Sequence, residues 1–322
     1  MSEQSPEGPT LESPTRAGFA AVIGAPNAGK STLVNRLVGS KVTIVSQKVQ
    51  TTRFPIRGVA MAGRTQIVLV DTPGIFTPRR RLDRAMVRSA WGGSEGAEVT
   101  VHLVDAQAQL ALMEGKPSAA DRRAAHDVQS IVDGLKGAGR KAILAINKID
   151  HMRRDTLLGV SQALFDEEVY DQVFMISAAT GDGVDDLKAV LAERMPEGPW
   201  LYPEDQSADM PARLLAAEIT REKIYLRLHE ELPYAASVET TAFAEQKNGL
   251  RLEQTIYVER EGQRPIVLGQ GGQTLKWIGE QSRKDLAEIF DRPVHLFLHV
   301  KVKENWAEER GLYSDLGLDF DV

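Results

Sequence analysis

One eight-residue segment constrains the fold of this chain more than any other. Residues 24–31 read Gly-Ala-Pro-Asn-Ala-Gly-Lys-Ser and fit the pattern G-x-x-x-x-G-K-[ST], between an apolar run at residues 19–23 and a helical pattern at residues 31–37. In such a strand–loop–helix unit, the loop N–H groups and the N-terminal end of the helix point toward one centre. The segment therefore predicts a loop that holds a polyphosphate at the edge of an α/β sheet.

Apolar runs and helical patterns continue to alternate as far as residue 195. Runs rich in β-branched and aliphatic residues cover residues 67–70, 99–104, 142–146 and 173–176, and helical patterns cover residues 121–135, 155–165 and 185–191. Such runs are typical of strands buried on both faces of a parallel sheet. We therefore predict a doubly wound, mostly parallel α/β domain over residues 17–195.

The order of elements changes after residue 195. Four prolines punctuate residues 196–211, which we interpret as a linker. We then expect, in order, a helix (212–231), two hairpin-connected strands (237–244 and 250–259), a helix pair around residues 269–272 and a last strand (294–303). The last strand alternates aliphatic with polar or aromatic residues, so one face of this sheet should be exposed. The pattern predicts a smaller α+β domain over residues 212–303.

Composition excludes several classes of protein. The chain has 322 residues, a net charge of −6 and no cysteine, which excludes disulfides, thiolate metal sites and a thiol nucleophile. No uncharged stretch approaches the length of about 20 residues that spans a membrane, and we expect a cytoplasmic protein with a disordered tail at residues 1–16. Residues 304–322 hold six acidic residues and one basic residue, and we expect an acidic C-terminal tail there. The second domain is nearly neutral and gives no compositional sign of nucleic-acid binding.

Two motifs indicate how a nucleotide and its metal are held. In the first loop, Lys30 would reach the β and γ phosphates and the Ser31 hydroxyl would coordinate Mg2+. Asp71-Thr72-Pro73-Gly74 directly follows the run at residues 67–70, so the Asp71 carboxylate would meet the water shell of the same ion. The alternative for this second motif is a capped turn, because Asp-x-Pro-Gly is good turn chemistry in any protein.

A third motif, at residues 147–150, predicts which base is bound. An ionised carboxylate only accepts hydrogen bonds, so Asp150 can pair with guanine N1–H and its exocyclic amine but finds no matching donors on adenine. The motif therefore indicates GTP and speaks against an ATP-dependent kinase or helicase. A fourth motif would place a backbone N–H on guanine O6, and it consists of Ser177, Ala178 and Ala179.

The polar segment at residues 46–53 occupies the place of a nucleotide-sensing loop, which we call switch I. A threonine here would complete the Mg2+ shell and sense the γ-phosphate, and we choose Thr52 over Thr51. The alternative is a polar loop whose threonines are merely exposed. The four nucleotide motifs occur in one order at the carboxyl ends of strands, and together they resemble the P-loop G domain of a translation-factor-class GTPase.

Two further patterns point toward RNA. Gly269-Gln270-Gly271-Gly272 reads as G-x-x-G, and the order helix–strand–strand–helix–GxxG–helix–strand is that of a type II KH domain, whose loop clamps single-stranded nucleic acid. We assign RNA contacts to this loop and to Lys276; a glycine-rich helix connection is the alternative. Five arginines could also dock RNA phosphates, although a solvated face is the more frequent role of such a run: Arg79, Arg80, Arg81, Arg84 and Arg88.

From residue 18 to about residue 306 the chain resembles the Era family of bacterial ribosome-assembly GTPases. The resemblance rests on the nucleotide motifs, on Gln50-Thr51-Thr52-Arg53 and on Arg221-Glu222-Lys223. It implies a monomeric GTP-hydrolysing switch that binds GTP or GDP with Mg2+, binds 16S ribosomal RNA near its 3′ end, assists 30S subunit assembly and contacts the inner membrane peripherally. Loops of this family usually carry Lys within GxxG, and Gln270 removes one cation from the phosphate clamp.

The position that orients the attacking water in Ras-like GTPases differs in this chain. Ras-like GTPases use a Gln directly after D-x-x-G, but Ile75 stands here and has no hydrogen-bonding group. Asn27 could instead ligate a monovalent cation, K+, between the α and γ phosphates, or it could simply stabilise the turn of the loop.

An RNA chaperone that uses nucleotide only as a structural ligand is the alternative function. Multiple-turnover hydrolysis of GTP would distinguish a GTPase switch from such a chaperone.

These assignments define three sets of residues. We assign catalysis to Lys30, Thr52, Gly74 and Asn27, and metal binding to Ser31, Thr52 and Asp71. The expected GTP contacts are Gly24, Ala25, Pro26, Asn27, Ala28, Gly29, Lys30, Ser31, Thr32, Asp71, Thr72, Pro73, Gly74, Asn147, Lys148, Asp150, Ser177, Ala178 and Ala179.

Overall fold

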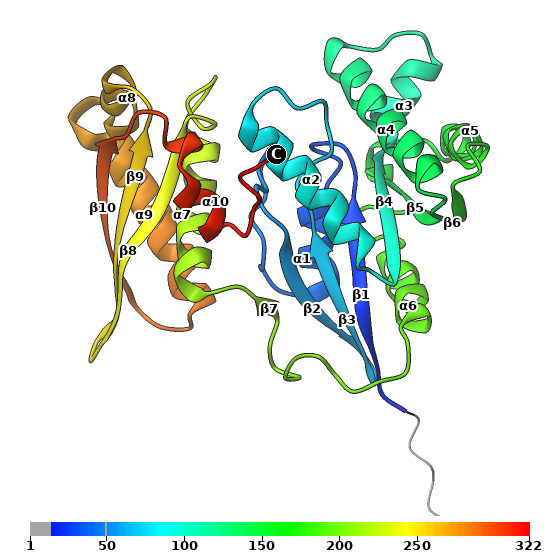
Figure 1. The fold of residues 1–322 in the computed structure, drawn as a ribbon, viewed down its shortest axis with the longest axis horizontal. Helices are drawn as coiled ribbons and strands as arrows, with labels where there is room; N and C mark the ends of the chain where they lie inside the picture. Colours follow the sequence, from blue (N-terminus) through cyan, green and yellow to red (C-terminus); the bar gives the residue numbers. More distant parts are fainter. Residues whose placement is uncertain (1–13, 49) are drawn as a thin grey trace, which may run out of the picture.

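Two β-sheets, one of seven strands and one of three, organise the chain in a computed structural model that describes residues 14–48 and 50–322 (Figure 1). The disordered tail expected at residues 1–16 falls almost wholly outside the described residues. Arg16 already belongs to the first strand of the larger sheet, where it is paired with Thr65.

The larger sheet has the strand order β6-β5-β4-β1-β3-β2-β7. Strands β1, β3, β4, β5 and β6 are parallel to one another. At one edge, β2 is antiparallel to β3 and β7 is antiparallel to β2. The strand bounds are β1 (Arg16–Ile23), β2 (Ile56–Ala62), β3 (Thr65–Asp71), β4 (Val99–Asp105), β5 (Ala142–Asn147), β6 (Tyr170–Met175) and β7 (Ala208–Asp209). The predicted α/β domain with a mostly parallel sheet is confirmed.

Helices cover both faces of this sheet, which explains the continuously apolar strands. On one face, α1 and α6 pack Leu33 and Leu187 against β1 and β3. On the other face, α4 and α5 pack Ile131 and Leu157 against β4 and β5. The helices of this domain are α1 (Lys30–Val38), α2 (Arg81–Glu95), α3 (Ala106–Met113), α4 (Ala119–Gly137), η1 (Ile149–His151), α5 (Arg154–Phe165) and α6 (Val184–Arg194).

The proline-rich segment at residues 196–211 is a connection that lies against the first domain. Gln66 of β3 donates to the Tyr202 carbonyl at 2.8 Å, and its side-chain oxygen accepts from the Leu201 and Tyr202 N–H groups. The short strand β7 then pairs with β2 through Arg57 and Gly58. Most of the segment between the two domains is therefore fixed to the edge of the larger sheet.

The second domain has three helices on one face of its sheet. Its strand order is β10-β9-β8, with β8 antiparallel and β10 parallel to β9. The elements are α7 (Ala212–Arg227), β8 (Ala236–Gln246), β9 (Gly249–Val258), η2 (Glu261–Gln263), α8 (Arg264–Leu268), η3 (Gln270–Gly272), α9 (Gln273–Ile289) and β10 (Val294–Val302). In β10, Val294, Leu296 and Val300 are buried while His295 and Phe297 are exposed, so the predicted exposed sheet face is confirmed.

Two expectations for the second half of the chain are corrected. The helix expected over residues 212–231 ends at Arg227, because Leu228 is extended and Pro233 cannot continue a helix. The acidic C-terminal residues are folded rather than a free tail, and they form η4 (Trp306–Glu308) and α10 (Arg310–Asp315). Tyr313 is fully buried and packs with Phe54, Met86 and Leu318, so apolar side chains fix this segment across the first domain.

Candidate functional site

The loop between β1 and α1 has the geometry of a phosphate-binding loop. Gly29 and Asn27 have positive φ values of 100° and 63°, and they turn the backbone around a central space. Within that loop, the Lys30 ammonium donates to the carbonyl oxygens of Gly24 at 3.0 Å and Ala25 at 2.9 Å. Burial lowers the pKa of Lys30 to about 8, an effect that Asp71 opposes. A bound polyphosphate would supply a close anionic partner to this buried cation.

Oxygen atoms from three separate segments converge beside this loop. The Ser31 hydroxyl donates to the Asp71 carboxylate at 2.8 Å and lies 3.0 Å from the Thr52 hydroxyl, which is 3.3 Å from the same carboxylate. Thr43 adds a third hydroxyl, which donates to the Asp71 carboxylate at 2.8 Å. Burial raises the pKa of Asp71, against the hydrogen bonds from Ser31 and Thr43.

This oxygen cluster fits a hard divalent cation. Among the described residues, Asp71 Oδ1 is buried without a hydrogen-bond partner, and hydroxyl and carboxylate oxygens are the ligands that Mg2+ prefers. No group of three or more His, Cys, Asp or Glu side chains within residues 14–48 and 50–322 forms a metal cage. The protein would therefore supply only part of the metal shell, as expected for an ion that is shared with nucleotide phosphates and water.

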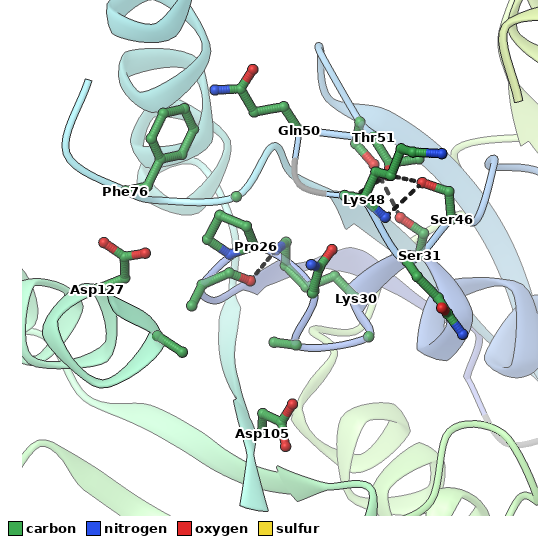
Figure 2. A pocket seen from close by; sticks show the side chains of 18 of the residues that line it. Pro26, Lys30, Ser31, Ser46, Lys48, Gln50, Thr51, Phe76, Asp105 and Asp127 are labelled. Atoms are coloured by element: carbon green, nitrogen blue, oxygen red, sulfur yellow. Dashed lines mark hydrogen bonds between the residues drawn. The ribbon is translucent and has the colours of Figure 1, made fainter. Parts of the chain in front are cut away.

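Thr51 and Thr52 point in different directions, so the structure distinguishes the two candidates for the sensing threonine. The Thr51 hydroxyl lies 2.6 Å from that of Ser46 and donates to the Lys48 carbonyl, so its partners belong to switch I itself. Figure 2 shows Thr51, Ser46 and Lys48 together on one side of the pocket, beside Ser31. Thr52 is buried and belongs to the oxygen cluster, which is the position that a metal-sensing threonine requires.

The segment after Asp71 is pressed against the phosphate-binding loop. A Cβ at Gly74 would lie 2.9–3.0 Å from atoms of Pro26, and the Ile75 N–H donates to the Gly24 carbonyl at 3.1 Å. Ile75 is buried within the core beside α4, so its side chain offers nothing to a water molecule. Thr72 donates to the Val22 carbonyl at 2.8 Å and ties this turn to β1.

The base-reading motifs are joined by one buried side chain. Asn147 donates to the Ala28 carbonyl at 2.8 Å and accepts from the Ala178 N–H at 2.9 Å. Asn147 thereby holds the phosphate-binding loop and the Ser177-Ala178-Ala179 segment in one frame. A hydrogen bond with Ser177 lowers the pKa of Asp150, so this carboxyl is ionised at neutral pH, as base reading requires.

A large cleft connects most of these groups. Its volume is about 2010 Å3, whereas small-molecule sites usually have about 300–1,000 Å3. Of the expected GTP contacts, its lining holds Ala25, Pro26, Asn27, Ala28, Gly29, Lys30, Ser31, Thr32, Gly74, Asn147, Lys148, Asp150, Ala178 and Ala179. Five others support the site from behind this lining: Gly24, Asp71, Thr72, Pro73 and Ser177.

Sequence reasoning missed several residues at this cleft. Asp127 of α4 lies on the side of the cleft that Phe76 lines (Figure 2), and burial raises its pKa. Lys148 donates to Asp105 at 2.6 Å, and this pair closes the base end of the cleft. Neither carboxylate belongs to a motif, and the helical pattern around Asp127 gave no sign of which face would meet the cleft.

The G-x-x-G loop is open to solvent. Gly271 and Gly272 have φ values of 59° and 78°, and a Cβ at either position would meet no atom within 4 Å. Lys276 lies one turn further along α9 with 76% of its side chain exposed. Beside them lies a groove of about 300 Å3 that is lined by Gly272, Leu275, Lys276, Gly279, Arg283, Leu296 and Leu298.

This groove combines an apolar floor with two cations, which suits an unstacked base and its phosphate. Gly279 lines the groove, and a Cβ there would make ordinary van der Waals contact with Arg283 and Leu298 at 3.5 Å. The sequence singled out the loop and Lys276. It gave no signal for Arg283, because a helix–strand groove depends on packing that no motif records.

The arginines of α2 contact residues of the C-terminal segment, and Arg84 and Arg88 remain exposed, as expected for a solvated face. Arg81 lies 3.3 Å from Glu308 and 4.4 Å from the Phe320 ring centre. Arg88 lies 3.4 Å from Asp319, and Arg84 donates to the Val322 carbonyl. The acidic C-terminal residues have the opposite charge, and they cover this side of α2.

Comparisons with known proteins agree with the structures of both domains. A family model described as 50S ribosome-binding GTPase matches residues 19–148, and a KH domain model matches residues 231–307. GTPase Era of Caulobacter vibrioides is 74% identical over 311 residues, covering 96% of this chain and 98% of the relative. GTPase Era of Maricaulis maris is 59% identical and covers 97% of this chain and 99% of its own length.

Two solved structures have the same fold over nearly the whole chain. A variant of Era from Aquifex aeolicus bound to GDP·AlF4− matches with a TM-score of 0.84 and 34% identity, covering 94% of this chain and 99% of that one. Era in complex with MgGDPNP and nucleotides 1506–1542 of 16S ribosomal RNA matches with a TM-score of 0.84 and 35% identity over the same shares.

Proposed function

Because this chain belongs to the Era family of GTPases, we propose that its GTP hydrolysis times the binding and release of 16S ribosomal RNA during 30S subunit assembly. The chain is a GTPase with a G domain followed by a KH domain. The observation that carries the proposal is the place of Thr52 in the oxygen cluster with Ser31 and Asp71. A residue of switch I at the metal position gives the chain a means to distinguish GTP from GDP.

Mg2+ would be held by the hydroxyls of Ser31 and Thr52, with Asp71 acting through the water shell. The ion would supply positive charge to the β and γ phosphates when bound. The residues of the chain do the rest: Lys30 neutralises phosphate charge at the other side of the loop, and Gly74 brings its backbone N–H near the γ-phosphate position. Asp150 and the Ala178 segment select the guanine base.

On the RNA side, the glycine loop and its groove would hold a single strand. The exposed backbone of Gly271 and Gly272 lets phosphates approach closely, and Lys276 adds charge. Leu296 and Leu298 form the apolar floor on which bases can lie. The relative whose structure includes 16S ribosomal RNA supports this assignment of the ligand.

Multiple-turnover kinetics test the proposed switch. The full chain should release many equivalents of phosphate from GTP, and it should bind the 3′-terminal segment of 16S ribosomal RNA more tightly with a nonhydrolysable GTP analogue than with GDP. A scrambled RNA of equal length is the control. Stoichiometric hydrolysis with the same RNA affinity in both nucleotide states would instead support an RNA chaperone that uses nucleotide as a structural ligand.

We also propose that K+ takes part in hydrolysis through Asn27. The Asn27 side chain is exposed in the cleft and the residue adopts a left-handed conformation, φ 63°, that brings it over the loop. Turnover should be several-fold faster in K+ than in Na+ at matched ionic strength, and Asn27→Ala should remove the difference. Equal rates in both salts would leave Asn27 as a turn residue only.

The remaining features concern where the protein works and in what state. No helix within residues 14–48 and 50–322 is long and apolar enough to cross a membrane. A cytoplasmic location, a monomeric state and peripheral contact with the inner membrane are part of the proposal. Sedimentation of the chain with and without anionic vesicles tests the last two together.

A further inference from the structure

Helix α7 is buried on every side over much of its length. Ten consecutive residues, 216–225, are buried, although four of them carry charge. A helix with a single partner buries only one stripe, so α7 must have a second partner besides its own sheet. On one side Thr220 donates to Gln254 of β9 at 2.6 Å, and the other side faces switch I of the first domain.

Arg221, whose side chain is only 2% exposed, contacts switch I. Its guanidinium donates through Nε to Glu218 at 2.7 Å, and through Nη2 both to Glu218 and to the Thr51 carbonyl. Burial alone would lower the pKa of Arg221, but the Glu218 carboxylate outweighs it and the pKa is raised. Glu218 therefore fixes both the charge and the direction of the donor that reaches Thr51.

The Thr51 carbonyl is one peptide bond away from the oxygen cluster. Because the peptide unit is planar, a fixed Thr51 carbonyl also fixes the plane from which Thr52 begins. The Thr52 hydroxyl lies 3.0 Å from Ser31 and 3.3 Å from Asp71. A donor on the second domain thus binds the residue directly before the expected metal ligand.

Other contacts hold the same stretch of chain against the second domain. Tyr225 donates to the Gln50 carbonyl at 3.3 Å, and Lys48 donates to the Leu228 carbonyl at 2.7 Å. Arg53 donates to the Ala236 carbonyl at 3.1 Å and lies 5.1 Å from the ring centre of Trp306. Switch I, as described at residues 46–48 and 50–53, is therefore tied to the second domain on both sides of Thr51.

We propose that Arg221 is a positioning residue of the GTPase site, which the second domain supplies to hold Thr52 in its metal-binding conformation. The inference rests on the proposed metal-binding role of Thr52. GDP has no γ-phosphate for this threonine to sense, so the clamp stabilises the GTP complex and contributes little to the GDP complex. Arg221 then sets the preference of the protein for GTP over GDP.

The test compares the affinities of the full chain for a nonhydrolysable GTP analogue and for GDP, both with Mg2+. Arg221→Ala should lower the ratio of the two affinities about tenfold or more while GDP affinity changes less than twofold, since a charged hydrogen bond is lost in one state only. Arg221→Lys should give an affinity ratio between those of the wild type and Arg221→Ala. Arg213→Ala is the matched control, because this arginine of the same helix donates to the Thr240 and Thr241 carbonyls within the second domain.

Two further variants keep the test decisive. Removing Arg221 leaves Glu218 buried without its partner, so the double variant Glu218→Leu with Arg221→Met removes the clamp without a lone charge and should show the same fall in ratio. Thr52→Ala removes the expected metal ligand itself, and it is the reference for the fall in the affinity ratio. If Thr52→Ala lowers the ratio and neither Arg221→Ala nor the double variant does, the clamp is overturned and the proposed function stands.

Two other outcomes would also overturn the clamp. An unchanged ratio in Thr52→Ala would overturn the metal-binding role on which both proposals rest. A parallel loss of GTP-analogue and GDP affinity in the double variant would show a general structural effect instead of a clamp.

Discussion

The proposed nucleotide site and the proposed RNA groove of this chain are built on opposite principles. At the nucleotide site, the Asp71 carboxylate is fully buried and receives three side-chain hydrogen bonds before any ligand arrives. At the RNA groove, Gly271 and Gly272 have open space around them and Lys276 is largely exposed. A buried, preorganised site discriminates between ligands sharply, whereas an exposed backbone loop binds through many weak contacts.

The largest effect is expected at the nucleotide site, in its preference for one base over another. Asp150→Asn should shift the preference from GTP toward XTP by about 10³-fold, because the amide offers the donor that the xanthine C2 carbonyl needs and loses an acceptor for guanine. Competition binding of GTP and XTP measures the shift. Asp155→Asn, on the exposed first turn of α5, is the control. An unchanged GTP preference would contradict the base-reading role of Asp150.

A smaller effect is expected at the open loop. Gly272→Asp should weaken RNA binding about tenfold or more and leave GTP affinity unchanged, because a carboxylate at the phosphate approach repels the strand at close range. Gly272→Asn is the matched control, since asparagine tolerates the left-handed conformation at φ 78° without adding charge. Equal RNA affinity in the Asp variant and the wild type would show that the clamp lies elsewhere.

The smallest expected effect comes from adding a contact to the loop instead of removing one. Gln270→Lys should raise RNA affinity two- to fivefold and steepen the dependence of log affinity on log salt by about one unit, as one more phosphate is neutralised. Gln270→Met controls for side-chain length. An RNA affinity and a salt slope that both equal the wild-type values would mean that this side chain does not reach a phosphate.

Sequence could predict the first site far better than the second. Residues 24–31 and 147–150 fix local backbone and chemistry together, so the motif and the structure coincide. The helix α2 and the strand β2 were missed. The arginines of α2 were read as a charged run although its apolar residues recur at the helical period, and β2 contains glycine and alanine, which are poor strand formers. The groove beside Arg283 and the clamp of Arg221 depend on which surfaces meet in three dimensions, and no local pattern encodes that.

The C-terminal segment illustrates the same limit. Its charge of one basic and six acidic residues predicted a tail, and that composition outweighed three aromatic residues. In the structure, Tyr313 and Phe320 pack at 4.9 Å between ring centres, and Trp306 donates to the Ala235 carbonyl. Burial of a few aromatic side chains contributes more than the solvation of exposed carboxylates, so composition misleads here.

Ile44, which lies just before switch I, belongs to the hydrophobic core of the second domain. It is fully buried among Ile219, Leu252 and Leu286, none of which comes from its own domain. A core that draws on both halves of the chain couples their melting. Calorimetry should therefore record one cooperative transition in place of two, and GDP, although it binds only the first domain, should raise the melting temperature of the second.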